Sequence, residues 1–248
     1  MRRLALLALL PLLLVACRTD TPPPANGAPG LRPVEVLFEF AAGDDHGWEA
    51  GFSDYSPQHG DLGFESGIAP LPASLDREGS GFRLGGMNRS DDLFMYMKRR
   101  LSTEDDVIPG QAYRVTYRVL FASDAPVGCA GIGGAPGESV FLKMGATAEE
   151  PETVLQGDMY TLTVDKGEQA TGGREVWVTG DIANGIDCEE ALDAGSPHAE
   201  VERTYQHDGT VTAGEDGTLW LIVGTDSGFE GFSDLYYIEI EVLLEPVH

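Results

Sequence analysis

Three aromatic residues stand in segments where their rings could bind a sugar. Trp48 and Tyr55 lie in a long polar segment rich in glycine, and Trp177 lies in a short predicted strand. Sugar binding needs aromatic faces that lie flat against a pyranose, framed by hydrogen-bonding side chains. The same rings fill protein cores equally well, so both roles stay open for these three residues. Trp220, inside the apolar run LWLIV, is expected to be a core residue.

The motifs of the common enzyme classes do not occur in the sequence. There is no G-x-S-x-G elbow, no H-E-x-x-H zinc motif and no P-loop. The glycine-rich segment 131–137 contains Pro136 and precedes no helical pattern, so phosphate binding is not expected. Two carboxylates spaced for glycoside hydrolysis would arise by chance among 41 acids. A polysaccharide hydrolase is therefore the less favoured alternative to a non-catalytic protein.

The N-terminus predicts export and lipid attachment. Arg2 and Arg3 precede an apolar run over residues 4–16, which is too short to span a bilayer and ends in small residues, as export signals do. Residues 14–17, Leu-Val-Ala-Cys, resemble the lipobox of bacterial lipoproteins. The resemblance implies that residues 1–16 are a cleaved signal peptide and that Cys17 carries acyl chains such as palmitate. The alternative is an ordinary secretory signal followed by a chance cysteine.

Residues 17–33 are predicted to be a tether between the lipid and a single domain over residues 34–248. The tether holds five prolines and one large apolar residue, Leu31, so it should stay extended and unpacked. Arg18 follows the lipidated cysteine, where known lipoproteins retained in the inner membrane often have aspartate. This favours an outer-membrane or cell-surface location, with membrane contact through the lipid anchor.

The two remaining cysteines, Cys129 and Cys188, form an even pair in a protein predicted to be exported. An oxidising compartment favours a disulfide between them, and the alternative is two free buried thiols. A metal site is less favoured, because neither cysteine belongs to a C-x-x-C pair and no histidine lies close in sequence.

Charge excludes one class of partner. The chain has 41 acidic against 16 basic residues, for a formal net charge of -25. Such a field repels nucleic acid and anionic lipid surfaces, so no DNA or RNA partner is expected. The acids either form a solvated surface that keeps the protein soluble, or include a set that binds calcium.

Alternating apolar and polar residues predict an all-β protein of about ten strands. The clearest segments are residues 112–122 and residues 218–244, and the latter is expected to form a hairpin-like pair of strands that closes the sheet at its edge. Further strands are expected at 34–40, 81–87, 93–101, 139–144, 159–164, 175–179 and 199–206. Residues 188–192 favour a short helix, and residues 41–79 a long loop that is either functional or contains short elements. The irregular spacing favours a two-sheet antiparallel β-sandwich over a closed barrel.

Two strands carry a resemblance to a known family. Residues 111–117, QAYRVTY, and residues 235–242, LYYIEIEV, resemble strands of the galactose-binding-like β jelly roll found in many bacterial carbohydrate-binding modules. The resemblance implies a jelly roll, a carbohydrate ligand and a structural calcium between the first and last strands. Glu239 replaces the aspartate usual in the closing strand. The candidate calcium ligands are therefore loop acids: Asp44, Asp45, Asp226 and Asp234.

These observations together predict a lipid-anchored, exported binding protein without catalytic activity. Its expected ligand is a carbohydrate or another cell-envelope molecule. The first alternative is a structural or assembly lipoprotein that binds an envelope protein, and the second is the polysaccharide hydrolase.

Overall fold

The computed structural model describes residues 31–90 and 92–247. The chain divides into two units, Met1–Leu31 and Arg32–His248, and the second contains every strand described below. The predicted signal peptide, Cys17 and residues 17–30 of the predicted tether lie outside the described residues. Within the described part of the chain, no helix is long and apolar enough to cross a membrane.

The larger of the two main sheets has seven strands, and all of its pairs are antiparallel. Its main path runs β11-β6-β14-β4-β3, while β1 pairs with β14 and β12 pairs with β6. The strands are β1 (Val34–Glu39), β3 (Glu65–Pro70), β4 (Ser80–Met87), β6 (Ala112–Ser123), β11 (Ala199–Gln206), β12 (Val211–Thr212) and β14 (Phe232–Pro246).

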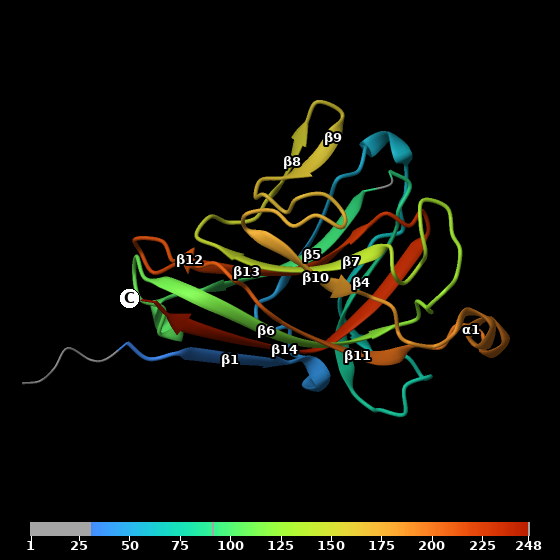
Figure 1. The fold of residues 1–248 in the computed structure, drawn as a ribbon, viewed down its shortest axis with the longest axis horizontal. Coiled ribbons are helices and arrows are strands. Elements are labelled where there is room, and N and C mark those ends of the chain that lie inside the picture. The colour runs from blue at the N-terminus through green and yellow to red at the C-terminus, as the bar shows by residue number, and fades with distance from the viewer. Residues whose placement is uncertain (1–30, 91, 248) are drawn as a thin grey trace, which may run out of the picture. The chain divides into compact units, whose positions relative to one another are not determined.

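The second sheet has five antiparallel strands in the order β10-β7-β13-β5-β2. Its members are β2 (Glu49–Ser53), β5 (Leu93–Leu101), β7 (Val140–Thr147), β10 (Val176–Asp181) and β13 (Leu219–Ser227). A separate hairpin pairs β8 (Thr153–Gln156) with β9 (Met159–Leu162). Figure 1 shows the two main sheets as layers, with this hairpin beyond the five-stranded one. The predicted two-sheet antiparallel sandwich is confirmed.

The main core lies between the two sheets because their strands alternate in side-chain character. In β6, alternate residues from Tyr113 to Phe121 are fully buried. In β13 the facing set is Leu219, Leu221 and Val223, which are also fully buried. A strand places successive side chains on opposite faces, so this period of two buries one face of each sheet against the other. The alternation expected over residues 112–122 is confirmed.

The C-terminal segment is arranged differently from its prediction. β13 lies between β5 and β7 in one sheet, and β14 lies among β1, β4 and β6 in the other. The expected hairpin and closing edge are therefore wrong, because each strand is interior to its own sheet. The outer face of β14 is apolar in its first half and carries Glu239 and Glu241 in its second half. In the first half, Tyr236 and Ile238 pack against Leu75 on the side away from the main core.

The predicted loop over residues 41–79 contains two strands, β2 and β3, which the sequence did not reveal. β8 and β12 were also missed, so the described residues form fourteen strands where about ten were expected. These additional strands have two to six residues and are rich in glycine or polar side chains, so they carry little periodic signal. The short helix is present as α1 (Cys188–Ala194).

A disulfide joins Cys129 to Cys188, with 5.1 Å between their Cα atoms. It ties the loop after β6 to the first turn of α1, and confirms the predicted pair.

The outer face of the five-stranded sheet is covered. Phe94 and Tyr96 of β5 alternate with residues of the main core, and they form a second buried cluster with Val164, Val176 and Ile222. Val164 belongs to the segment between β7 and β10, which also carries the β8–β9 hairpin. This segment therefore acts as a cap on the sheet, and the polar sites described next lie under it or at its margin.

Candidate functional site

An open groove, here called the aromatic groove, lies between the five-stranded sheet and the β8–β9 hairpin. Its volume is about 450 Å³. The sheet contributes residues 49–52 of β2 with Tyr96 and Lys98 of β5, and the hairpin side contributes Glu152, Thr153 and Tyr160. Tyr55, which follows β2, completes the lining. Four aromatic residues and two carboxylates therefore converge from segments far apart in the sequence.

The floor of the groove depends on a glycine beneath a tyrosine. A Cβ atom on Gly51 would lie 2.2 Å from the ring of Tyr96, so only glycine lets this ring rest on β2. The Tyr96 hydroxyl is hydrogen-bonded to Oγ1 of Thr153 at 3.0 Å. That Thr153 hydroxyl also reaches the carbonyl oxygen of Phe52 at 3.0 Å. The ring and the hairpin are thus held together over the sheet.

Two further tyrosines line the groove where the hairpin contacts the segment after β2. The amide of Tyr160 donates to the carbonyl of Tyr55 at 2.9 Å, and the amide of Asp54 donates to the carbonyl of Tyr160 at 2.6 Å. Their rings lie 4.9 Å apart at an angle of 30°. Neither hydroxyl has a hydrogen-bond partner among the described residues. Burial raises the pKa of Tyr55, so its hydroxyl stays neutral and can donate at physiological pH.

The charges at the groove are predominantly negative. Lys98 Nζ pairs with Glu150, donates to the carbonyl of Pro151 at 3.0 Å, and lies 5.1 Å from the ring centroid of Trp220. The carboxylates of Glu49 and Glu152 form no ion pair within the described part of the chain. Trp220 was expected in the core, but it is only partly buried beneath Lys98.

The three predicted aromatic residues do not come together. Trp48 is 3% exposed and packs edge-on against Phe38, and Trp177 is 4% exposed and stacks on His207 at 3.6 Å between ring centroids. Both belong to the main core, so only Tyr55 lines the groove. Sequence reasoning missed Tyr96 and Tyr160. Tyr96 lies in a strand that is apolar on both faces at its start, and that pattern indicates burial without indicating which residue meets a cavity.

The four predicted calcium ligands occupy three separate places. Asp44 and Asp45 accept backbone hydrogen bonds from His46 and Gly47 at 2.8 and 2.9 Å. Asp234 forms a bidentate pair with Arg83 at 2.8 and 3.1 Å. Asp226 is buried beside two lysines. Among the described residues, no group of three or more candidate ligands could hold a metal. Calcium binding stays a prediction, without a preformed set of oxygen ligands to support it.

Asp226 belongs to a cluster of five ionisable residues beneath the cap, here called the buried charge cluster. Its Oδ2 lies 2.7 Å from Lys143 Nζ and 2.8 Å from Lys166 Nζ. Lys166 Nζ also lies 3.2 Å from Asp54 and 3.8 Å from Asp92. The side chains of Lys143 and Asp226 are completely buried. Ion pairs enclosed to this degree are costly to build, because both charges lose water.

Burial changes the protonation of this cluster. It raises the pKa of Asp92 to about 7, aided by the neighbouring Asp226, and it raises the pKa of Asp54. Burial also lowers the pKa of Lys143. For Lys166 burial acts in the same direction, but the carboxylates of Asp226 and Asp54 outweigh it and raise the pKa. Lys166 is therefore the firmly charged lysine of the two.

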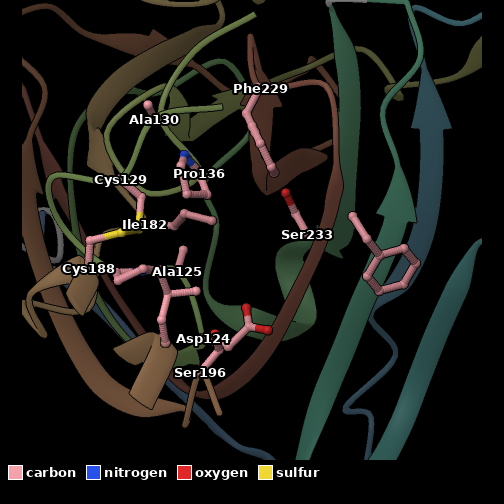
Figure 2. Close-up of a pocket in the computed structure, with 13 residues that line it drawn as sticks. Asp124, Ala125, Cys129, Ala130, Pro136, Ile182, Cys188, Ser196, Phe229 and Ser233 are labelled. Atoms are coloured by element: carbon pink, nitrogen blue, oxygen red, sulfur yellow. A yellow bond between two sulfur atoms is a disulfide. The ribbon is translucent and has the colours of Figure 1, made fainter. Parts of the chain in front are cut away.

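A second cavity, here called the loop-end pocket, lies beside the disulfide (Figure 2). Its volume is about 320 Å³ and its walls are mainly apolar, with Ile182, Pro136 and Phe229 among them. Figure 2 shows the carboxyl of Asp124 and the hydroxyl of Ser233 directed into the open space. Burial raises the pKa of Asp124. The pocket suits a small apolar molecule with one polar group.

Comparisons with known proteins assign no family. A scan against protein families found no match, and a comparison with curated proteins found none either.

Among solved structures, the chain is similar to carbohydrate-binding modules of the β-sandwich superfamily studied for promiscuous specificity, at 13% identity and a TM-score of 0.36 over 85% of this chain and 61% of that one. It spans less than two thirds of that relative. A second is TmCBM61 in complex with β-1,4-galactotriose, at 9% identity and a TM-score of 0.32 over 82% of this chain and 92% of that one.

A third is the carbohydrate esterase vb_24B_21 from Shiga toxin-encoding bacteriophage phi24B, at 11% identity and a TM-score of 0.38, which covers 85% of this chain and 97% of that one. Similarity at this level carries no argument about function. The assignment of architecture rests on the strand pairing described above.

Proposed function

We propose that this protein binds a neutral or amine-bearing saccharide in the aromatic groove, without transforming it. The main support for this proposal is the arrangement of two tyrosines. Tyr55 and Tyr160 converge on an open groove, and their hydroxyls have no partner among the described residues.

The chemistry of the groove matches that of a sugar. The C–H face of a pyranose packs against aromatic rings, and its hydroxyls need hydrogen-bond acceptors and donors in the same site. Glu49 and Glu152 supply carboxylate acceptors, and the two tyrosine hydroxyls supply donors. An apolar ligand would leave these four polar groups without partners, at a cost in affinity. A polar ring-shaped ligand satisfies them.

Charge narrows the class of saccharide. Lys98 is paired with Glu150, so the unpaired charges that line the groove are the carboxylates of Glu49 and Glu152. The whole chain is also strongly acidic, with a formal charge of -25. Both features repel uronic acids, sulfated glycans and phosphorylated polymers. They tolerate neutral sugars and favour amino sugars that carry a positive charge.

The proposal places this binding at the cell envelope. A lipid on Cys17 and the tether over residues 17–33 would hold the domain close to a membrane, at the outer membrane or the cell surface. Replacement of Cys17 by serine is expected to release the full chain from the membrane fraction. Retention of that variant in the membrane would contradict lipid anchoring at this residue.

The binding experiment uses the full chain and a panel of neutral, amino and acidic oligosaccharides. We expect saturable binding of neutral or amino members and none of the acidic ones. Tyr160→Ala and Tyr55→Ala should each weaken binding. Leu155→Ala is the matched control, because Leu155 lies on the same hairpin, is exposed and does not line the groove. Binding that is absent from the whole panel, or unchanged in both tyrosine variants, would refute the proposal.

Two carboxylates in the groove favour one alternative, a polysaccharide hydrolase that uses Glu49 and Glu152 as its acid pair. The same panel distinguishes it. Hydrolysis predicts new reducing ends that disappear in Glu49→Gln or Glu152→Gln. The binding protein leaves every oligosaccharide intact.

A further inference from the structure

The buried charge cluster brings a lysine and an aspartate together away from bulk solvent. Lys143 of β7 and Asp226 of β13 lie on neighbouring strands of the five-stranded sheet, 83 residues apart in the sequence. Nζ of Lys143 lies 2.7 Å from Oδ2 of Asp226, and both side chains are completely buried. An amine and a carboxyl held in contact without solvent have the composition of an amide plus one water molecule. Exclusion of water removes the bulk solvent that would reverse such a condensation.

Three acceptors surround the lysine. Lys143 Nζ contacts the carbonyl oxygens of Lys166 at 2.8 Å and Thr171 at 3.1 Å, besides the carboxylate of Asp226. A neutral amine has two N–H bonds and one lone pair. If its two N–H groups donate to the two carbonyls, the lone pair is directed at the carboxyl of Asp226. Burial, which lowers the pKa of Lys143, favours this neutral form.

Two carboxyl oxygens in the cluster lack a donor. Oδ1 of Asp226 and Oδ1 of Asp92 are both buried, and no described residue donates a hydrogen bond to either. Nζ of Lys166, the nearest cation to Asp92, is 3.8 Å from its Oδ1, which is too far for a hydrogen bond. Asp92 and Asp226 both lie around Nζ of Lys166, at 3.8 and 2.8 Å, so the two carboxyl groups are neighbours beside one ammonium. Protonation of Asp92 reduces the repulsion between them, and it places an acid near the carboxyl that faces Lys143.

We infer that Lys143 and Asp226 become joined by an intramolecular isopeptide bond, with the carboxyl of Asp92 as the proton-transfer group. The inference is independent of saccharide binding, because none of these three residues lines the aromatic groove.

Formation of the isopeptide bond is a condensation that needs no oxidant, reductant or cofactor. The ammonium of Lys143 first gives a proton to the carboxylate of Asp226, which leaves an amine and a carboxylic acid. The nitrogen lone pair then attacks Cγ of Asp226 and a C–N bond forms. Asp92 gives its proton to one oxygen of the intermediate and receives a proton from the nitrogen. The C–O bond to the protonated oxygen breaks, and one water molecule leaves.

The second lysine keeps a different role. Lys166 Nζ has Asp54 at 3.2 Å as a further partner and lies 5.3 Å from the ring centroid of Phe94. It therefore remains an ammonium, and with the backbone N–H of Gln169 it faces Oδ2 of Asp226. These donors hold Oδ2 of Asp226 in place beside Nζ of Lys143. After the reaction, Lys166 and Asp54 remain as a neutral pair.

Mass spectrometry of the full chain tests the bond directly. We expect the tryptic peptide that contains Lys143 to be recovered as a branched species with the peptide that contains Asp226, lighter than their sum by one water molecule. The linked Cys129–Cys188 peptide in the same unreduced digest verifies that the protein is folded and oxidised. Recovery of both peptides without the branch, in a digest that contains the disulfide, would overturn the inference. A branch from Lys166 instead would overturn the assignment of Lys143.

Variants assign the roles. Lys143→Arg should abolish the branched peptide, and Asp92→Asn should abolish it or slow its formation by orders of magnitude. Lys98→Arg is the matched control, since Lys98 forms its ion pair outside the cluster, and it should leave the branch unchanged. Full formation of the branch in Asp92→Asn would refute the role of Asp92.

Discussion

The outer faces of both sheets carry charged side chains, but these side chains are hydrated on one sheet and buried on the other. On the seven-stranded sheet, Arg118 of β6 pairs with glutamates of β11 and β14 (Glu202, Glu239 and Glu241), and these side chains remain partly exposed. On the five-stranded sheet, a cap covers the face and encloses Lys143 and Asp226 completely. Charged side chains that stay hydrated lose little solvation energy on folding, and their ion pairs contribute little to the stability of the fold. Charges that lose water require close partners, so they are the ones that impose a specific geometry.

The largest expected difference between the two faces comes from removal of the central carboxylate. Asp226→Ala removes the carboxylate partner of Lys166 and the carboxyl that the isopeptide bond with Lys143 requires, so both lysines stay buried without it. The free energy of unfolding should fall by at least about 3–5 kcal/mol, the usual cost of breaking a buried ion pair, and loss of the covalent bond adds to that fall. Denaturant unfolding at neutral pH measures it. A loss below about 1 kcal/mol would place this cluster in the same class as an exposed ion pair.

The floor of the aromatic groove is expected to be the next most sensitive point. Gly51→Ala puts a Cβ atom 2.2 Å from the Tyr96 ring, and overpacking of this kind costs about 1–3 kcal/mol. Tyr96→Ala removes the obstacle, so the double variant should be more stable than the sum of the single effects indicates. Additive losses in thermal unfolding of the three variants would show that the ring is not what restricts this position.

Asp92 should give the covered face a distinctive pH dependence. Its folded pKa is raised from an ordinary 3.8 to about 7, so between these values the folded protein holds a proton that the unfolded chain has lost. Its contribution to stability therefore falls as the pH rises from about 4 to about 7, and is constant above that. Thermal unfolding across this range should show the fall in the native protein and a smaller one in Asp92→Asn. Identical profiles would contradict the shifted pKa.

The smallest effect is expected on the open face. Glu241→Gln removes one of three carboxylates around Arg118, and the other two remain. Exposed pairs contribute at most about 1 kcal/mol, and salt screens them. Denaturant unfolding with and without added salt should barely separate this variant from the native protein. A loss comparable to that of Asp226→Ala would remove the contrast between the two faces.

The strands could be predicted from the sequence, whereas the site under the cap could not. The alternation from Tyr113 to Phe121 and the glutamates of β14 report directly on one buried face and one wet face, so the strands and the sandwich were accessible. The disulfide followed from an even pair of cysteines in a chain predicted to be exported. The strand signal is local in the sequence, and the disulfide prediction depends on the number of cysteines.

The candidate site was not accessible in the same way, because a cap from a distant segment creates it. Trp48 and Tyr55 look alike in the sequence, yet one fills the core and the other lines the groove. Asp226 resembles a loop acid fit for calcium, but its register on β13 directs it toward two lysines. The contacts between these side chains depend on the order of the strands in the sheet and on the segment that covers it. The local hydrophobic periodicity of the sequence indicates neither.

The central claim is that the covered margin of the five-stranded sheet binds a saccharide. Titration calorimetry with the neutral or amino oligosaccharide that binds most tightly tests this claim most directly. It compares two variants of the full chain, Tyr160→Ala in the groove and Arg118→Gln on the open face. Loss of an aromatic contact should weaken binding about tenfold in Tyr160→Ala, which corresponds to about 1.4 kcal/mol. Arg118→Gln should leave the affinity unchanged. Equal affinities in the two variants, or a loss confined to Arg118→Gln, would contradict the account.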